Sequence, residues 1–215
     1  MVAQNLIPAI RETVYKNEGG NGYALSYAKK GSSGASFGFM QGDMHVQPDA
    51  RDTMRKVLAA AGADQAQIDR LVALLTPALP NGSPLSSADA RFVDAALSSA
   101  AGRPLVDAMD MRILQGVLDD VDGCIAAAGA RNLTIAPLAL LYIAPWINMT
   151  GAPTTLKKWL GGAPINDYPP PPPPPGVQGA HMEGYLKATK FFRENPKNFK
   201  HFSDCVAAGA KLLPA

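Results

Sequence analysis

Apolar residues recur every three to four positions along most of the chain, which is the spacing of one face of an α-helix. The first such run predicts a helix over 4–17 that ends at the pair Gly19-Gly20, because glycine readily adopts the backbone conformation that terminates helices. Capping residues and glycines mark the boundaries of later runs. Further helices are expected over 49–61, 64–76, 86–102, 103–122, 134–149, 180–193 and 196–212.

One early segment, residues 23–45, breaks this helical pattern. Its aromatic residues alternate with glycines and serines, as at Tyr23, Tyr27, Phe37 and Phe39. This composition predicts short strands or a small hairpin instead of a helix. The fold class is therefore predicted to be mainly α (α+β), with one small β-hairpin after the first helix.

A second unusual segment contains seven consecutive prolines at 169–175. Such a run adopts a stiff polyproline II conformation and cannot continue a helix in the core. Because helical patterns lie on both sides, we expect residues 165–179 to form a surface strap. A ligand for an aromatic-lined groove on a partner is the alternative interpretation.

Composition limits the classes of protein to which this chain can belong. It has 215 residues, of which 47% are hydrophobic, enough for one good core and at most two small domains. A net charge of +2 gives no reason to expect nucleic acid as a partner. The N-terminus lacks the pattern of a secretory signal, and the apolar stretch 134–149 is too short and proline-interrupted to span a bilayer. We therefore expect a soluble chain without membrane insertion.

The candidate chemistry lies where the first helix meets the irregular segment, at Glu18. The negative end of a helix dipole and burial against apolar groups both favour the protonated form of a carboxyl group. A protonated carboxyl group is what a glycosidase needs to protonate the glycosidic oxygen. A hairpin rich in glycine and serine offers backbone groups that can hydrogen-bond a sugar.

This stretch resembles the signature of the lytic transglycosylases in the lysozyme-like superfamily. In that signature a catalytic glutamate precedes serine or glycine, and a loop leads to Gly-Ala-x-Gly-Leu-Met-Gln. Here Glu18-Gly19-Gly20-Asn21 is similar to the first part and GASFGFMQ at 34–41 to the second, with one extra residue between the two glycines. The resemblance implies a single lysozyme-like domain over 1–215, with 23–45 as the hairpin of its cleft.

The same resemblance implies roles for particular residues. Glu18 takes the place of the general acid, and Gln41 that of a sugar-binding residue on the cleft floor. Tyr27 and Ser36 would face the substrate from the hairpin. A looser counterpart of a later family motif at 141–151 adds Tyr142 and Asn148 as substrate-binding candidates. Gln41 and Asn148 have structural interpretations too, because amide side chains also bond backbone groups. For Tyr142, on an apolar helix, the alternative is a place in the core.

Asp43 is the candidate second carboxylate and leaves the reaction type open. An inverting hydrolase of the chitosanase-like or lysozyme type needs a base about 6.5–9.5 Å from the acid to activate water. A lytic transglycosylase needs none, because its glutamate directs the sugar's own 6-hydroxyl into ring closure. Asp43 could equally cap a turn.

No metal or cofactor is expected, because the histidines stand apart from other ligand residues. Cys124 and Cys205 are compatible with a disulfide and with two buried thiols. The expected substrate is peptidoglycan or a related amino-sugar polymer. Without a leader, such an enzyme would reach the cell wall by specialised export or host lysis, with export machinery or an immunity protein as partners. The rival to an enzyme is a non-catalytic module that recruits partners through its polyproline run.

Overall fold

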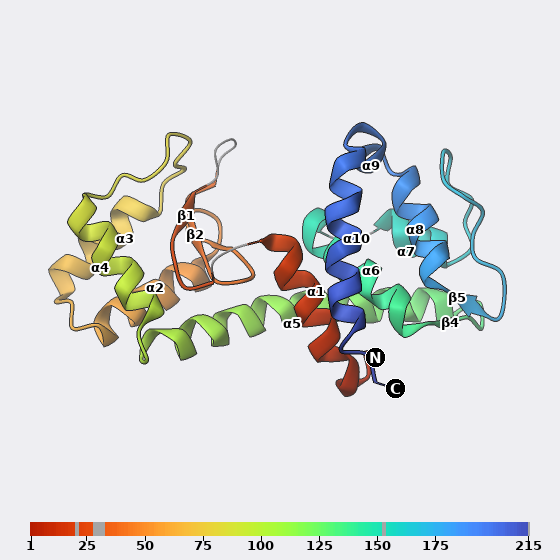
Figure 1. Ribbon diagram of the computed structural model, residues 1–215, viewed down its shortest axis with the longest axis horizontal. Coiled ribbons are helices and arrows are strands. Elements are labelled where there is room, and N and C mark those ends of the chain that lie inside the picture. The colour runs from red at the N-terminus through yellow and green to blue at the C-terminus, as the bar shows by residue number, and fades with distance from the viewer. Residues whose placement is uncertain (20–21, 28–32, 152–153, 215) are drawn as a thin grey trace. The chain divides into compact units, whose positions relative to one another are not determined.

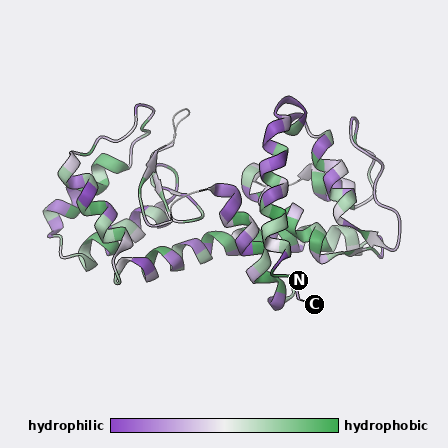
Figure 2. Cartoon of the chain, in the orientation of Figure 1, coloured by the Kyte–Doolittle hydropathy of each residue, from purple (hydrophilic) through white to green (hydrophobic). Residues whose placement is uncertain are grey.

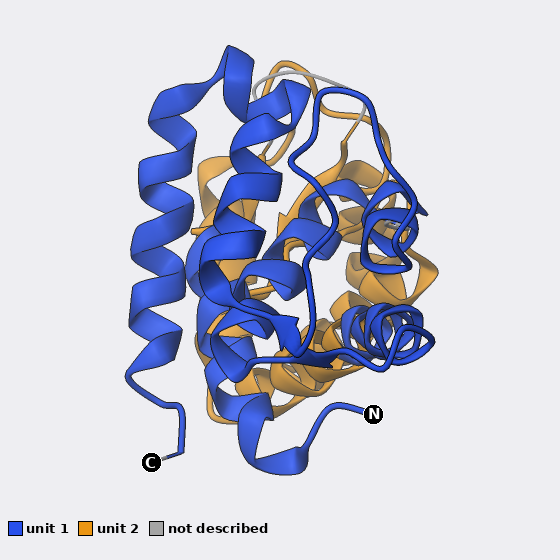
Figure 3. Cartoon of the chain, turned by 90° about the vertical axis from the view of Figure 1, so that its right-hand side faces the viewer, with its two compact units in different colours: residues 1–17, 115–215 blue, residues 18–114 orange. Residues whose placement is uncertain are grey.

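The computed structural model describes residues 1–19, 22–27, 33–151 and 154–214 (Figure 1). The chain divides into two compact units, residues 18–114 and the combination of 1–17 with 115–215 (Figure 3). Helix α5 (Gly102–Gly129) contributes residues to both units. The single lysozyme-like domain expected over 1–215 stays a prediction.

The unit of residues 18–114 joins a small sheet to a group of helices. Its elements after α1 are β1 (Ser26–Tyr27), β2 (Ala35–Phe37), β3 (Gly42–Asp43), α2 (Pro48–Ala60), α3 (Gln65–Leu75), α4 (Ser87–Ser98) and the first half of α5. The three strands form an antiparallel sheet in the order β1-β2-β3. The predicted mainly helical α+β class, with a small β region after the first helix, is confirmed.

The other unit is almost entirely helical. Its elements are η1 (Gln4–Leu6), α1 (Ile7–Glu18, whose last residue is assigned to the first unit), the second half of α5, β4 (Thr134–Ile135), α6 (Pro137–Thr150), α7 (Thr154–Leu160), β5 (Gly176–Val177), α8 (Gly179–Ala188), α9 (Lys190–Glu194) and α10 (Pro196–Ala210). Strands β4 and β5 form a parallel pair. Helix α1 approaches α10 closely, because Gly209 has no side chain where Thr13 packs.

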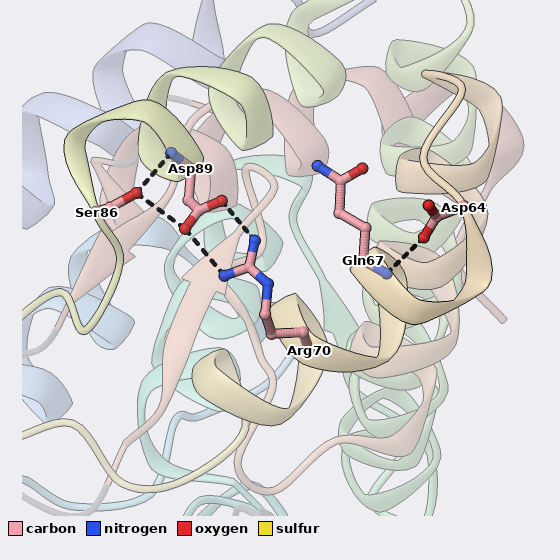
Figure 4. Close-up of polar contacts among 5 residues, drawn as sticks. All are labelled: Asp64, Gln67, Arg70, Ser86 and Asp89. Carbon is pink, nitrogen blue, oxygen red and sulfur yellow. Dashed lines mark hydrogen bonds and ion pairs between the residues drawn. The ribbon is translucent and has the colours of Figure 1, made fainter.

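Side-chain caps fix where α3 and α4 begin. The carboxylate of Asp64 accepts the backbone N–H of Gln67 at 2.8 Å, and the hydroxyl of Ser86 accepts that of Asp89 at 3.1 Å (Figure 4). Each cap satisfies a helix N–H that has no partner within the helix. Arg70 of α3 forms a bidentate ion pair with Asp89 of α4, with N···O distances of 2.7 and 3.0 Å, and this pair links the two helices.

The core of the unit 18–114 explains why its helices assemble around the sheet. Phe37 from β2, Met54 from α2, Leu71 from α3, Leu97 from α4 and Met109 from α5 are all fully buried in one cluster. Each such side chain contributes about 1.5–3 kcal/mol when it leaves water. Hydrophilic and hydrophobic stretches follow one another along α5 (Figure 2), and Met109 on this helix belongs to the cluster.

Several boundaries differ from those expected. Helix α5 continues past 122 to Gly129, because Val121, Cys124 and Ala128 extend its buried face at helical spacing. The helix expected over 180–193 is broken at Thr189, whose backbone is extended and whose hydroxyl begins α9 by accepting the N–H of Phe192. Helix α7 and the β4–β5 pair were not expected.

The proline run is fixed to its own unit at both ends. The indole N–H of Trp159 donates to the carbonyl of Pro169 at 2.9 Å, and the N–H of Thr134 donates to that of Pro175 at 3.3 Å. Within the run, Pro172 is buried whereas Pro170 and 173–175 are exposed. These contacts agree with a strap laid on the surface of the unit.

Helix α6 is strongly apolar, and its residues 139–147 are buried. Across the described residues, no helix combines the length and the apolar character needed to cross a membrane.

Candidate functional site

Helix α1 ends at Glu18, the predicted general acid. The next residue, Gly19, has a φ of +66°, the left-handed conformation that ends a helix at low cost only for glycine. The side chain of Glu18 is half-buried. The predicted helix end at this position is thus confirmed, whereas the catalytic role of Glu18 stays a prediction.

Gly22, four positions after Glu18, makes the first contact with the sheet region. The carbonyl of Gly22 accepts the N–H of Gly38 at 2.9 Å, and the ring of Phe39 fills the space beside Gly22. Four residues span at most about 14 Å, so Glu18 lies within that distance of Gly22. Glu18 and the turn at 38–41, which contacts Gly22, are therefore close along the chain.

The register of the sheet brings two predicted site residues together. Ser36 on β2 is the direct partner of Asp43 on β3, and on its other side it pairs with Ser26 of β1. Direct partners in a sheet point to the same face, so these three polar side chains form one row. All three are partly exposed. This row, Ser26, Ser36 and Asp43, is called the polar face below.

Tyr27 lies on the opposite face, although it was expected to face the substrate together with Ser36. It pairs with Ala35 and packs against the hydrophobic core of its unit. Because neighbouring residues of a strand alternate between faces, Tyr27 and Ser36 cannot both face one substrate. Burial raises the pKa of the Tyr27 hydroxyl. We therefore assign Tyr27 to the core side and keep Ser36 as the substrate-facing candidate.

The side-chain amide of Gln41 is held beside the polar face by hydrogen bonds. Its Nε2 donates to the carbonyl of Gly38 at 2.9 Å, and its Oε1 accepts the hydroxyl hydrogen of Ser26. Its φ is +51°, a conformation that non-glycine residues rarely adopt and that surrounding contacts must stabilise. The backbone-bonding interpretation of Gln41 therefore has direct support, and its side chain stays beside Ser26 at the edge of this face.

The carboxylate of Asp43 also bonds backbone groups. Its Oδ1 accepts the N–H of Gly34 at 3.0 Å and that of His45 at 2.7 Å. These two bonds hold the start of β2 against the turn that follows β3. Asp43 thus has a structural role of the turn-capping kind, and its catalytic role stays a prediction.

A residue that the sequence analysis did not single out, Asp110 on α5, holds the turn of residues 38–41. Its two carboxylate oxygens accept the N–H groups of Phe39 at 2.8 Å and Met40 at 3.0 Å. Asp110 is fully buried, and this burial raises its pKa to about 6, against the lowering effect of the two N–H donors. The sequence contains an indication of this role. Asp110 is a charged residue at a position of its helix where the spacing of apolar residues predicts burial, one residue after Met109.

Two further carboxylates fix the segment between Glu18 and the sheet. The hydroxyl of Tyr23 donates to Asp107 at 2.7 Å, and the N–H of Leu25 donates to Asp94 at 3.0 Å. The guanidinium of Arg103 lies 5.0 Å above the Tyr23 ring. Burial and the Asp107 carboxylate together raise the pKa of Tyr23 to about 12. Helices α4 and α5 thus supply the acidic side chains that position this segment.

Tyr142 and Asn148, the remaining candidates, lie on α6 in the other unit. Tyr142 is only 7% exposed and its ring lies 6.3 Å from that of Phe202 in a stacked arrangement. Burial raises the pKa of the Tyr142 hydroxyl. Asn148 is half-buried near the end of the helix. Tyr142 is therefore part of a core, and its expected contact with sugar stays a prediction, as does that of Asn148.

No group of three or more potential metal ligands occurs among the described residues. Cys124 and Cys205 are both buried free thiols. Comparison of the chain with protein-family models, with curated proteins and with solved structures found no match. The resemblance to the lytic transglycosylases therefore depends on residues 18–21 and 34–41, with the looser counterpart at 141–151.

Proposed function

We propose that the protein cleaves β-1,4 glycosidic bonds between the amino sugars of peptidoglycan, with Glu18 as the proton donor. The observation that carries the proposal is that α1 ends at Glu18 and that a small sheet with one polar face follows it in the sequence, within one compact unit. A glycosidase needs a carboxyl group beside a surface that hydrogen-bonds the sugar. We assign the first role to Glu18 and the second to Ser26 and Ser36 on the polar face.

Rigid support of the turn at 38–41 adds to this argument. Asp110 is buried with its carboxylate on the N–H groups of Phe39 and Met40, and Gln41 is held in a left-handed conformation. A buried carboxylate and a rare backbone conformation both cost stability. Proteins retain such costs at sites where geometry matters for function. We infer that this turn presents part of the cleft floor.

Of the two reaction types, we propose the lytic transglycosylase. Asp43 accepts hydrogen bonds from the backbone N–H groups of Gly34 and His45. These hydrogen bonds explain an aspartate at this position without a role as catalytic base. Glu18 alone would then protonate the leaving oxygen and afterwards, as the base, direct the 6-hydroxyl into ring closure. The product would carry a 1,6-anhydro end.

The test is incubation of purified peptidoglycan with the wild type and with Glu18→Gln, followed by mass analysis of the released fragments. Loss of general acid catalysis reduces rates by about 10²–10⁴-fold, so the variant should release almost nothing. Lys16→Gln is a matched control, because Lys16 is an exposed residue of the same helix end. Equal release by Glu18→Gln and wild type, or no release by either, would contradict the proposal.

A further inference from the structure

A groove lies between α2 and α3, in the same unit as the sheet. Its volume is about 690 Å³. Its polar lining consists of His45, Arg51, Arg55, Asp69 and Thr76, and apolar side chains of α3 such as Val72 complete it. None of these residues has a part in the proposed chemistry at Glu18. These residues form the α2–α3 groove.

The groove carries positive charge in fixed positions. Arg51 donates from Nη1 to the carbonyls of Met44 at 2.8 Å and His45 at 3.1 Å, which anchors its guanidinium beside the end of β3. Among the described residues, nothing accepts from its Nε or Nη2. Arg55 is oriented by an ion pair with Asp69 across the two helices. The groove lining thus contains two arginines and one aspartate, which gives it one net positive charge.

His45 adds an acceptor to these donors. Its Nδ1 lies 3.2 Å from the carbonyl oxygen of Thr76, and because a carbonyl oxygen can only accept, Nδ1 must carry the hydrogen. In the neutral ring, Nε2 is then an acceptor. The α2–α3 groove therefore offers cationic donors, one neutral acceptor and an apolar wall.

These features match a peptide that carries a carboxylate. Arginine binds carboxylates through paired N–H donors, a backbone N–H of a peptide suits the acceptor of His45, and short aliphatic side chains suit Val72. A doubly charged phosphate fits less well, because the carboxylate of Asp69 lies in the same groove and repels it more strongly than a single charge. The charge and the mixed polarity thus favour an acidic peptide.

The lining residue His45 is hydrogen-bonded to Asp43 of the polar face. The N–H of His45 donates to Asp43, and a side chain on Gly34 would collide with the backbone of His45 at 2.8 Å. The last residue of β3 and the first lining residue of the groove are therefore only two positions apart and fixed to each other. A ligand that contacts Asp43 on the polar face would therefore lie close to a lining residue of the α2–α3 groove.

We propose that the α2–α3 groove binds the carboxylate of the acidic stem peptide that peptidoglycan carries on its sugars. The identity of the polymer in this inference rests on the proposed function. The groove then distinguishes among amino-sugar polymers, because chitosan is cationic and chitin carries no acidic peptide. Arg51 and Arg55 select the substrate class, whereas Glu18 performs the chemistry.

Binding is measured by titration calorimetry with the full chain carrying Glu18→Gln, which separates binding from cleavage. The probes are the free acidic stem tetrapeptide, the same peptide with its carboxylates amidated, and inorganic phosphate. We expect the acidic peptide to bind and amidation to weaken it by about tenfold or more, the effect of losing charge-assisted hydrogen bonds. Equal binding of the amidated peptide, or tighter binding of phosphate, would overturn the inference.

The decisive variant is Arg55→Gln, with Arg70→Gln as its control. Both arginines are exposed and paired with an aspartate in the same unit, but Arg70 pairs with Asp89 and does not line the groove. Arg55→Gln should lower the affinity for the acidic peptide by about tenfold, and Arg70→Gln should leave this affinity unchanged. Equal weakening by both, with unchanged melting temperatures, would contradict a site in the groove.

The two proposals fail in different ways. With the wild type, intact peptidoglycan should be cleaved with a lower KM than glycan strands stripped of their peptides. Equal KM values for the two substrates would overturn the groove inference and leave the proposed function standing. Peptide binding that depends on Arg55, in a protein that cleaves neither substrate, would support the groove and overturn the proposed function.

Discussion

The Oδ1 atom of Asp110 occupies the space in which a side chain on Gly38 would lie. Gly38 has a φ of +82°, and its N–H is bonded to the carbonyl of Gly22. Because Gly38 has no side chain, the turn of residues 38–41 packs closely against α5. The Asp110 carboxylate can then accept the N–H groups of Phe39 and Met40. Glycine at 38 and aspartate at 110 depend on each other.

This relationship predicts a large effect of Gly38→Ala on stability. The alanine would be strained at positive φ and would also displace the Asp110 carboxylate, so we expect a loss of about 2–4 kcal/mol in the free energy of unfolding. Gly62→Ala is the matched control: its φ is +86°, yet nothing lies within 4 Å of the added carbon. The control should lose only about 1 kcal/mol in urea denaturation. Similar losses for both variants would contradict the packing argument.

The buried Asp110 predicts how stability changes with pH. Its pKa is raised from 3.8 to about 6 on folding, so between these values the folded protein binds more protons than the unfolded chain. Stability should therefore fall as the pH rises from about 4 to about 6, by on the order of 2–3 kcal/mol, and level off above that. Ion pairs lower the pKa values of Asp69 and Asp89, so their contributions are complete above pH 4 and lie outside this window.

Asp110→Asn should remove this slope. The amide cannot ionise, and its NH2 group cannot accept an N–H, whereas the hydroxyl oxygen of the protonated carboxyl group still can. The variant should therefore be less stable than the wild type at pH 4 by about 1–3 kcal/mol. The difference should shrink toward pH 7, where the wild type carries a buried charge. Urea denaturation at pH 4, 5, 6 and 7 measures it. A pH profile of Asp110→Asn parallel to that of the wild type would show that another group titrates.

Asp43→Asn separates the two reaction types. The Oδ1 of asparagine can still accept the N–H groups of Gly34 and His45, so the sheet should remain folded. For a lytic transglycosylase we expect turnover of peptidoglycan within about threefold of the wild type, with 1,6-anhydro ends in the products. Loss of about 10²-fold or more in a folded variant, with reducing ends in the wild-type products, would instead identify an inverting hydrolase with Asp43 as its base.

The two cysteines should be unreactive in the folded protein. Both are buried free thiols, and burial raises the pKa of Cys124 to about 12 and also that of Cys205. Because the thiolate is the reactive form, a thiol reagent such as DTNB should label neither until the protein unfolds. Two rapidly labelled thiols in native buffer would contradict this burial, and a change of melting temperature with reductant would indicate a disulfide.

The sequence by itself determined the local structure to a large extent. Helical periodicity and end signals placed most helices within a few residues, because helix boundaries depend on neighbours along the chain. The helix end at Glu18 and the strands between 26 and 43 followed from glycines and aromatic residues in the same way. The run of prolines likewise excluded a helix at 169–175.

Only the tertiary structure decided how the site is arranged. Strands of two or three residues are too short for an alternating pattern to assign faces, so nothing local showed that Ser36 pairs with Asp43 while Tyr27 lies on the core side. The partners of Asp110 are 70 and 71 residues away in the sequence, and the groove joins His45 to residues of α2 and α3. Local sequence fixes backbone conformation, whereas a site is made from side chains that meet only after the helices have packed.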